Sequence, residues 1–183
     1  MKSKIFFISC ISLVLLFCFS SNVLGQEKID LSIGFGMYEL ANVAVRYQIE
    51  QTQIGFSIGT LPWSDDQTLS ILGDVYYHFG DYSNLSSRKP WYIRFGLTYL
   101  HRESIKEEKY YLIEDHFYLN SRFGREFNIS KKIGLYVDLG ANFEIKYNRK
   151  ENYRESTEET CCQGGPQSFP VLPAVGIGMF YKF

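Results

Sequence analysis

The sequence has little of what proteins use to bind nucleic acid, metals or phosphate groups. It has 19 lysines and arginines against 20 acidic residues, a formal net charge of −1, and no basic patch suited to nucleic acid. Its three histidines and four cysteines do not form a cluster with the spacing of a metal site. A glycine-rich phosphate loop and an internal repeat are missing as well. We therefore expect no cofactor, no metal and no nucleic-acid partner.

Long apolar runs are confined to the start of the chain. Two lysines, Lys2 and Lys4, precede an almost unbroken apolar stretch over 5–19, and Val23 and Gly25 suit the −3 and −1 positions of a cleavage site. This pattern predicts a secretory signal peptide over 1–25 and a mature domain over 26–183. No later stretch has the length and apolar character of a transmembrane helix.

A lipoprotein is the alternative interpretation of this leader. It would require acylation of Cys18, and a bulky phenylalanine stands before that cysteine where a small residue is expected. The signal peptide is the preferred reading.

Aromatic residues and glycine are abundant. Aromatics make up 17% of the chain, with 14 Tyr and 15 Phe beside 15 Gly. This composition is typical of membrane β-barrels, whose aromatic side chains gather at the two membrane interfaces.

Apolar side chains recur at every second position through most of the mature chain, as in strands with one apolar face. In the last segment Val175, Ile177, Met179, Tyr181 and Phe183 form the apolar face. The segments with this alternation are 29–37, 42–49, 54–59, 69–79, 91–99, 117–124, 133–146 and 171–183. They predict an all-β fold, a closed eight-stranded antiparallel up-and-down transmembrane β-barrel.

Periodicity alone does not say which face points inward, and a soluble lipocalin-like barrel or a sandwich would place the apolar face inside. The signal peptide, the aromatic terminus and the charges on the minor face favour an apolar exterior. The minor face should then form a lumen packed by paired charges rather than a pore, because unpaired buried charges are costly. The predicted network is Asp30, Arg46, Asp74, Arg94, Arg122, Asp138, Glu144 and Lys146.

The connections between these segments should alternate between two sides of the membrane. With both termini in the periplasm, the periplasmic turns are 50–51, 81–89 and 128–132. The outer loops are 37–41, 61–67, 102–109 and 148–170, and the longest lies outside, as is typical of such barrels.

Taken together, the chain resembles the small eight-stranded outer-membrane β-barrel proteins of Gram-negative bacteria. The resemblance covers the mature chain by pattern, and its specific element is the carboxy-terminal Met179-Phe-Tyr-Lys-Phe183. In that class Met179, Tyr181 and Phe183 would form the signal read by the barrel-assembly machinery. The resemblance implies an outer-membrane location and contact with lipid and lipopolysaccharide, but it fixes no activity.

Two adjacent cysteines, Cys161 and Cys162, lie in the longest outer loop. In an oxidising compartment they are candidates for a disulfide, either a strained vicinal ring that stiffens the loop or an intermolecular bond.

Some barrels of this class modify lipid A, using a His–Ser pair with a carboxylate. Here His101 and Ser104 lie three residues apart, which places them on opposite faces of a strand, and His116 would approach from the next strand. Interfacial polar residues are the simpler interpretation.

We therefore expect a non-enzymatic outer-membrane barrel that serves envelope structure or binds an extracellular partner through its loops. Transport of a hydrophobic small molecule is the first alternative, and a lipid A-modifying enzyme is the second.

Overall fold

The structure is a computed structural model in which residues 28–64, 66–82, 84–107, 110–153 and 171–183 are described. These residues form eight strands, and each pairs antiparallel with its neighbours in the sequence. The strands are β1 (Ile29–Gly36), β2 (Leu40–Ile49), β3 (Thr52–Thr60), β4 (Gln67–Phe79), β5 (Trp91–Glu107), β6 (Tyr110–Asn128), β7 (Ile133–Tyr153) and β8 (Val171–Lys182). Within these ranges, no helix has the length and hydropathy needed to cross a bilayer.

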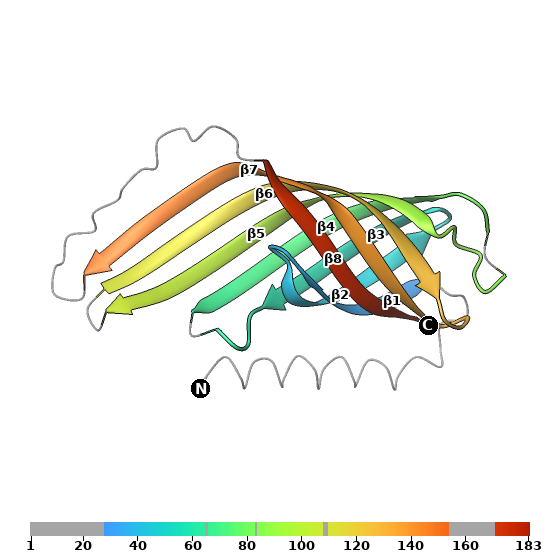
Figure 1. The fold of residues 1–183 in the computed structure, drawn as a ribbon, viewed down its shortest axis with the longest axis horizontal. Coiled ribbons are helices and arrows are strands. Elements are labelled where there is room, and N and C mark those ends of the chain that lie inside the picture. The colour runs from blue at the N-terminus through green and yellow to red at the C-terminus, as the bar shows by residue number, and fades with distance from the viewer. Residues whose placement is uncertain (1–27, 65, 83, 108–109, 154–170) are drawn as a thin grey trace.

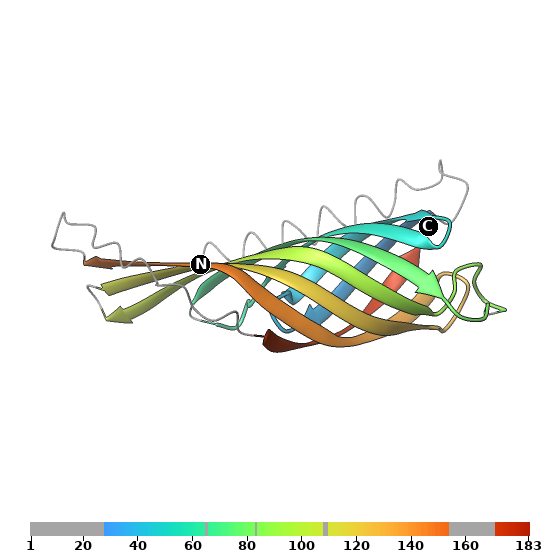
Figure 2. The ribbon, with the colours of Figure 1, turned by 90° about the horizontal axis from the view of Figure 1, so that it is seen from above.

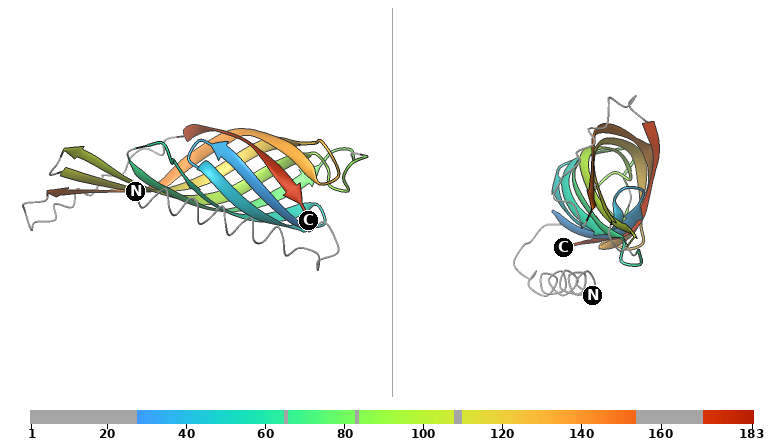
Figure 3. Two further views of the ribbon diagram at one scale, coloured as in Figure 1. Left: turned by 90° about the horizontal axis from the view of Figure 1, so that it is seen from below. Right: turned by 90° about the vertical axis from the view of Figure 1, so that its left-hand side faces the viewer.

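The last strand closes the sheet by pairing with the first. Ile33 lies opposite Met179 and Leu31 opposite Tyr181, while the backbone N–H of Phe183 donates to the carbonyl of Ile29 at 3.0 Å. The result is a ring of tilted strands, seen end-on in the right-hand view of Figure 3. The predicted closed eight-stranded antiparallel barrel is confirmed.

The apolar face of nearly every strand points away from the barrel. Phe56 is 54% exposed and Leu97 61%, whereas Tyr92 on the opposite face of the same sheet is fully buried. A soluble protein rarely exposes a continuous apolar surface of this extent. The alternation in the sequence therefore marks the outer wall of the barrel, with the polar face inside.

Glycines on the inner face make room for the aromatic rings that fill the lumen. A Cβ atom added to Gly124 would lie 2.3 Å from the ring of Tyr92, and one added to Gly34 would lie 2.1 Å from the hydroxyl of Tyr136. Side chains larger than hydrogen at these positions would displace the rings. The interior is therefore a packed core of rings and charged groups.

The two ends of the barrel differ. One end carries Phe183 and the connections between β2 and β3, β4 and β5, and β6 and β7, and is called here the C-terminal rim. At the other end β5, β6 and β7 continue well past their neighbours and form a three-stranded sheet, on the left in Figures 1 and 2. We call the outer part of these three strands, residues 101–107, 110–116 and 144–153, the tall sheet. Its residues 101–103 still pair with the start of β4, and the rest continues past the neighbouring strands.

The tall sheet corrects the predicted loops. Residues 102–107 and 148–153 were expected in outer loops, but they are strand residues paired with β6. Backbone hydrogen bonds form regardless of side-chain polarity, so a polar stretch can continue a strand once its neighbours are in register. Of the loop expected over 148–170, residues 154–170 lie outside the described residues.

A bulge in β7 reverses the faces near its outer end. Tyr118 lies opposite Glu144, whereas Phe117 lies opposite Lys146, so Ile145 is the extra residue. An extra residue shifts every later side chain to the other face of the sheet. Lys146 is therefore exposed on the outer face, and its predicted place in the lumen is wrong.

Candidate functional site

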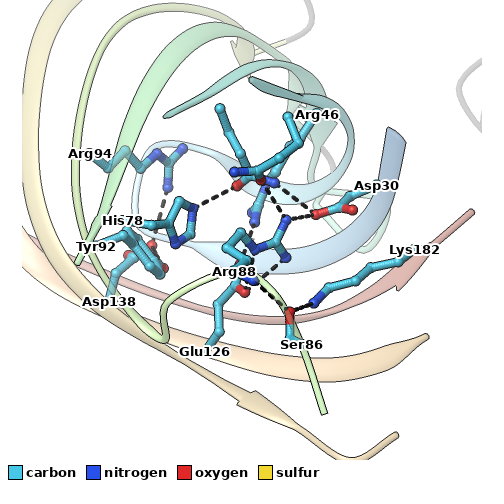
Figure 4. Close-up of polar contacts among 12 residues, drawn as sticks. Asp30, Arg46, His78, Ser86, Arg88, Tyr92, Arg94, Glu126, Asp138 and Lys182 are labelled. Atoms are coloured by element: carbon cyan, nitrogen blue, oxygen red, sulfur yellow. Dashed lines mark hydrogen bonds and ion pairs between the residues drawn. The ribbon is translucent and has the colours of Figure 1, made fainter. Parts of the chain in front are cut away.

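In the part of the lumen nearest the C-terminal rim, the charged side chains surround Arg88. The connection between β4 and β5 directs this side chain into the barrel. Its guanidinium donates to Glu126 at 2.9 Å and to Gln48 at 3.0 Å, and it also forms an ion pair with Asp30. Both carboxylates are buried. Figure 4 shows Arg88 between Asp30 and Glu126, beneath Arg46. A basic side chain from outside the strands thus closes the C-terminal rim of the lumen.

Hydrogen bonds fix this plug to the strands around it. Gln53 donates to Asp30 at 2.8 Å, and its amide oxygen lies 2.9 Å from Nε2 of His78. The other ring nitrogen of His78 lies 3.0 Å from the carbonyl of Lys89. Lys182 of β8 donates to Ser86 at 2.7 Å. The connection that carries Arg88 is therefore held directly by five strands, β1, β2, β4, β6 and β8, and Gln53 of β3 links two of its partners.

The middle of the lumen is crossed by Arg94 and Arg122. Arg94 contacts Asp74 at 2.8 Å and Asp138 at 3.3 Å, and Arg122 contacts Asp138 at 3.0 Å. Tyr92 donates a further hydrogen bond to Asp138 at 3.0 Å. Because each arginine can serve several acceptors at once, these charges form one network across the lumen.

Glu39 completes this network from the opposite end. The turn between β1 and β2 is tight, with positive φ at Tyr38 (71°) and Leu40 (62°), and it directs the Glu39 side chain into the barrel. The carboxylate contacts Arg122 at 2.8 Å and forms an ion pair with Arg94. Positive φ in residues other than glycine costs roughly 1–3 kcal/mol each, which these buried ion pairs help to offset.

Arg46 separates the two groups of charges. Its guanidinium lies between two rings, 4.7 Å from the centroid of Tyr76 and 4.6 Å from that of Tyr136. It also approaches Glu126 at 4.0 Å. A cation stacked between aromatic faces in a dry interior is stabilised by the ring quadrupoles.

The lumen is electrically balanced. Among the described residues, five buried carboxylates face five buried cations. The carboxylates are Asp30, Glu39, Asp74, Glu126 and Asp138, and the cations are Arg46, Arg88, Arg94, Arg122 and Lys182. Breaking such a buried pair from one side costs about 3–5 kcal/mol, so the network resists opening.

The outer face of the tall sheet carries a hydrogen-bonded group just beyond the apolar surface. Tyr99 and His101 both donate to the same carboxylate oxygen of Asp115, each at 2.7 Å. Partial burial raises the pKa of Asp115, but the hydrogen bonds from His101 and Tyr99 outweigh it and hold that pKa below its ordinary value.

The inner face of the tall sheet carries a second group. His116 donates to Glu144 at 2.6 Å, and its ring lies 4.7 Å from that of Tyr147. Tyr147 donates to Glu114 at 2.8 Å, and burial together with this bond raises its pKa. Tyr38, from the turn that carries Glu39, packs against Tyr118 with ring centroids 4.7 Å apart. The inner face thus continues the lumen outward as a surface of rings and carboxylates.

Comparison with known proteins gives matches in structure but not in sequence. No family model matches the chain, and no curated protein matches it. The N-terminal β-barrel domain of Pseudomonas aeruginosa OprF superposes with a TM-score of 0.57 at 14% identity, over 87% of this chain and 100% of that one. Acinetobacter baumannii CarO gives a TM-score of 0.46 at 14% identity, over 89% of this chain and 100% of that one.

The chain has the fold of a small outer-membrane β-barrel. The superposition on the OprF barrel domain spans that whole domain, and the exterior of this barrel is apolar, as the fold requires. At this level of identity the likeness concerns the fold alone.

The barrel brings together most of the residues predicted for the lumen. Asp30, Arg46, Asp74, Arg94, Arg122 and Asp138 are all buried inside it. Glu144 lies beyond the lumen on the inner face of the tall sheet, paired with His116. Lys146 lies on the outer wall because of the bulge at Ile145.

The residues considered for catalysis are not assembled. The side chain of His101 is on the outer face with Asp115, whereas Ser104 lies on the inner face of the same strand. His116 is also on the inner face, but it lies opposite Leu100, four residues along β5 from Ser104. No nucleophile–base pair forms among them. The described residues also contain no group of three or more metal-binding side chains.

Sequence reasoning missed Glu39 and Arg88, which close the lumen from its two ends. Both stand in connections, where the alternation of a strand gives no information. The length of the connection over 81–89 was the one available signal, since a turn of nine residues is longer than a hairpin needs.

The remaining predicted sites are placed only in part. Met179 and Tyr181 lie exposed on the outer wall, and the ring of Phe183 packs edge-on against Tyr181 with centroids 5.0 Å apart. Their reading by the assembly machinery stays a prediction. Cys161, Cys162 and the predicted signal peptide lie outside the described residues.

Proposed function

We propose that the protein is a closed, non-enzymatic barrel of the outer membrane that holds the tall sheet outside the cell as a binding surface. The barrel body is the anchor in this proposal, and an extracellular partner binds beyond it. The observation that carries the proposal is the contrast between a lumen filled by balanced ion pairs and a sheet that continues past the membrane-facing wall.

The apolar exterior supports the membrane location. Outward side chains such as Ile54, Phe95 and Leu139 are each more than 50% exposed. Aromatic rings gather at the C-terminal rim, where Trp91 and Phe79 both contact Phe123, and again at the outer end, where Tyr99 packs on Phe117 at 4.9 Å. Membrane β-barrels have an apolar band of this kind, with a ring of aromatic side chains at each membrane interface.

The plugs at both ends support a closed lumen. Glu39 enters from the outer end and Arg88 from the C-terminal rim, and each is held by buried partners of opposite charge. An ion crossing the barrel would have to separate these pairs in a poorly hydrated interior, at a cost of several kcal/mol. We therefore expect no steady ion current through the wild-type protein.

Single-channel recording tests this expectation. The mature chain is refolded in detergent, checked for a heat-modifiable band on gels, and inserted into planar bilayers. The folded wild type should show no steady conductance. The double variant Glu39→Ala with Arg88→Ala removes both plugs and should show small, frequent openings. Steady conductance in the wild type would contradict a closed lumen and make small-molecule transport the better function.

Epitope insertion tests the orientation. A short tag between Trp63 and Ser64 lies beside the tall sheet, and a matched tag between Glu50 and Gln51 lies at the C-terminal rim. On intact cells an antibody should detect the first tag alone, and both tags after permeabilisation. Detection of the second tag on intact cells would reverse the proposed topology.

A further inference from the structure

A cavity lies at the C-terminal rim, on the wall of the barrel that faces away from the lumen. Its volume is about 450 Å³, and its lining includes Asp81, Tyr82, Trp91, Arg125, Phe127 and Asn128. The volume falls within the range usual for small-ligand sites. It is a second candidate site, on the face of the barrel that meets lipid.

The walls of the cavity are fixed by the β5–β6 pair. Trp91 and Arg125 lie directly opposite each other, and the backbone N–H of Glu126 donates to the carbonyl of Pro90 at 2.8 Å. Glu126 also contributes to the lining, but its carboxylate points into the lumen, where it is paired with Arg88. The charge available to a ligand therefore comes from residues on the outside.

Arg125 supplies an oriented cation. Its guanidinium lies 4.8 Å from the ring of Trp91 and 5.1 Å from the ring of Phe127. Rings on both sides limit the motion of the long side chain and leave the edge of the guanidinium for a ligand. A guanidinium edge matches the two oxygens of a phosphate group better than an ammonium does.

Asp81 and Tyr82 supply the complementary part. Asp81 is exposed at the start of the connection between β4 and β5, and Tyr82 beside it is 65% exposed. The ammonium of Lys89 lies 5.3 Å from the centroid of the Tyr82 ring, so this ring already holds one cation. A ligand ammonium group would bind the Asp81 carboxylate beside it, at the ring or in place of Lys89. One cavity thus offers a partner for a negative group and a partner for a positive group.

The height of the cavity indicates which molecule carries both. It lies where the apolar outer wall ends, since Trp91 of its lining packs against Phe123, an exposed residue of that wall. In a bilayer this level is occupied by phospholipid headgroups and the start of their acyl chains. We propose that the cavity binds the headgroup of a zwitterionic phospholipid with a primary amine, its phosphate on Arg125 and its ammonium on Asp81 and Tyr82. The acyl chains would run along the apolar wall.

The proposal rests on the proposed membrane location but not on the closed lumen. Loss of the heat-modifiable band would mean that the membrane barrel itself is wrong. A well-folded barrel without lipid selectivity would mean that only the cavity proposal is wrong.

Tryptophan fluorescence offers a direct measurement, because the chain has two tryptophans and one of them lines the cavity. Substituting Trp63→Phe, at the other end of the barrel, leaves Trp91 as the reporter. The refolded protein in dodecyl maltoside is titrated with dihexanoyl phosphatidylethanolamine and, separately, with dihexanoyl phosphatidylglycerol. Binding of the ethanolamine lipid should be saturable and about tenfold tighter than binding of the glycerol lipid, which lacks the ammonium group.

Three variants assign the two contacts. Arg125→Gln should weaken binding of both lipids by about tenfold, with Arg125→Lys intermediate because the charge remains without the planar fork. Asp81→Asn should reduce the preference for the ethanolamine lipid to twofold or less. Lys131→Gln, which removes an exposed cation at the same rim, is the matched control and should change neither affinity.

Several outcomes would overturn the proposal. Equal affinity of the wild type for the two lipids would remove the role of Asp81. Unchanged binding in Arg125→Gln would remove the phosphate contact. Equally tight binding of inorganic phosphate or free phosphoethanolamine would mean that the cavity takes an anion from solution rather than a lipid.

Discussion

The tall sheet continues three of the eight strands of the barrel body, β5, β6 and β7, yet the two regions are stabilised differently. In the body each strand has a neighbour on both sides, and polar side chains are buried in ion pairs such as Arg94 with Asp74, whose side chains are 5% and 2% exposed. In the tall sheet β7 pairs only with β6 beyond Phe143. Its Arg102 pairs with Asp66, but these side chains are 50% and 24% exposed.

The difference shows that an arginine–carboxylate pair contributes more to the free energy of unfolding in the barrel body than in the tall sheet. A buried arginine with several carboxylates is costly to remove, because the partners stay behind without water. A half-exposed arginine is solvated whether or not its partner is present. Stability therefore resides in the body, and the tall sheet is freer to vary in sequence.

The sharpest test removes one arginine from each region. Arg94→Met leaves Asp74, Asp138 and Glu39 with fewer cations and should lower the free energy of unfolding by about 3–5 kcal/mol. Arg102→Met, the matched variant in the tall sheet, should cost about 0–1 kcal/mol. Urea unfolding in lipid vesicles, followed by tryptophan fluorescence, measures both. Equal losses in the two variants would remove the distinction between the regions.

A smaller effect is expected from a methyl group placed in the packed lumen. Gly124→Ala would bring Cβ to 2.3 Å from the ring of Tyr92 and disturb its hydrogen bond to Asp138, at a cost of about 1–3 kcal/mol. Gly73→Ala is the control, since a Cβ there meets nothing within 4 Å, and it should change stability by less than about 0.5 kcal/mol. The same unfolding assay applies. If Gly124→Ala were as stable as the control, the lumen would be less tightly packed than described.

The smallest effect concerns Asp115 in the tall sheet. Its pKa is lowered in the folded protein, so its contribution to stability is present above the unfolded-state pKa, about 3.9, and is lost as the pH falls through the lower folded-state value. Asp115→Asn should therefore speed hydrogen exchange of neighbouring β6 amides at pH 6 and hardly at all at pH 2. The effect should remain local and leave the exchange of the barrel body unchanged. A difference between the two proteins that grows toward low pH would contradict the assignment.

Much of the barrel could be predicted because apolar and polar side chains alternate along each strand. Alternation divides the residues of β3 and β8 between two faces, and the signal peptide, the aromatic terminus and the charges on the minor face indicated which face points outward. The buried positions of Asp30, Asp74 and Asp138 agree with that choice. The prediction of Lys146 failed because one extra residue at Ile145 reverses the faces, and a bulge leaves no mark in the alternation. The cavity at Trp91 and Arg125 could not be predicted, because its other wall is a connection.

The sequence by itself determined a closed barrel with an apolar exterior and a charged interior. Strand periodicity assigns each side chain to one of two faces, and the signal peptide, the aromatic terminus and the charges on the minor face indicate which face is outside. Only the tertiary structure decided that Glu39 and Arg88 close the lumen from opposite ends and that polar segments of β5–β7 continue as a sheet. Turn geometry and strand length depend on backbone pairing between segments far apart in the chain, which the local pattern of side chains does not record.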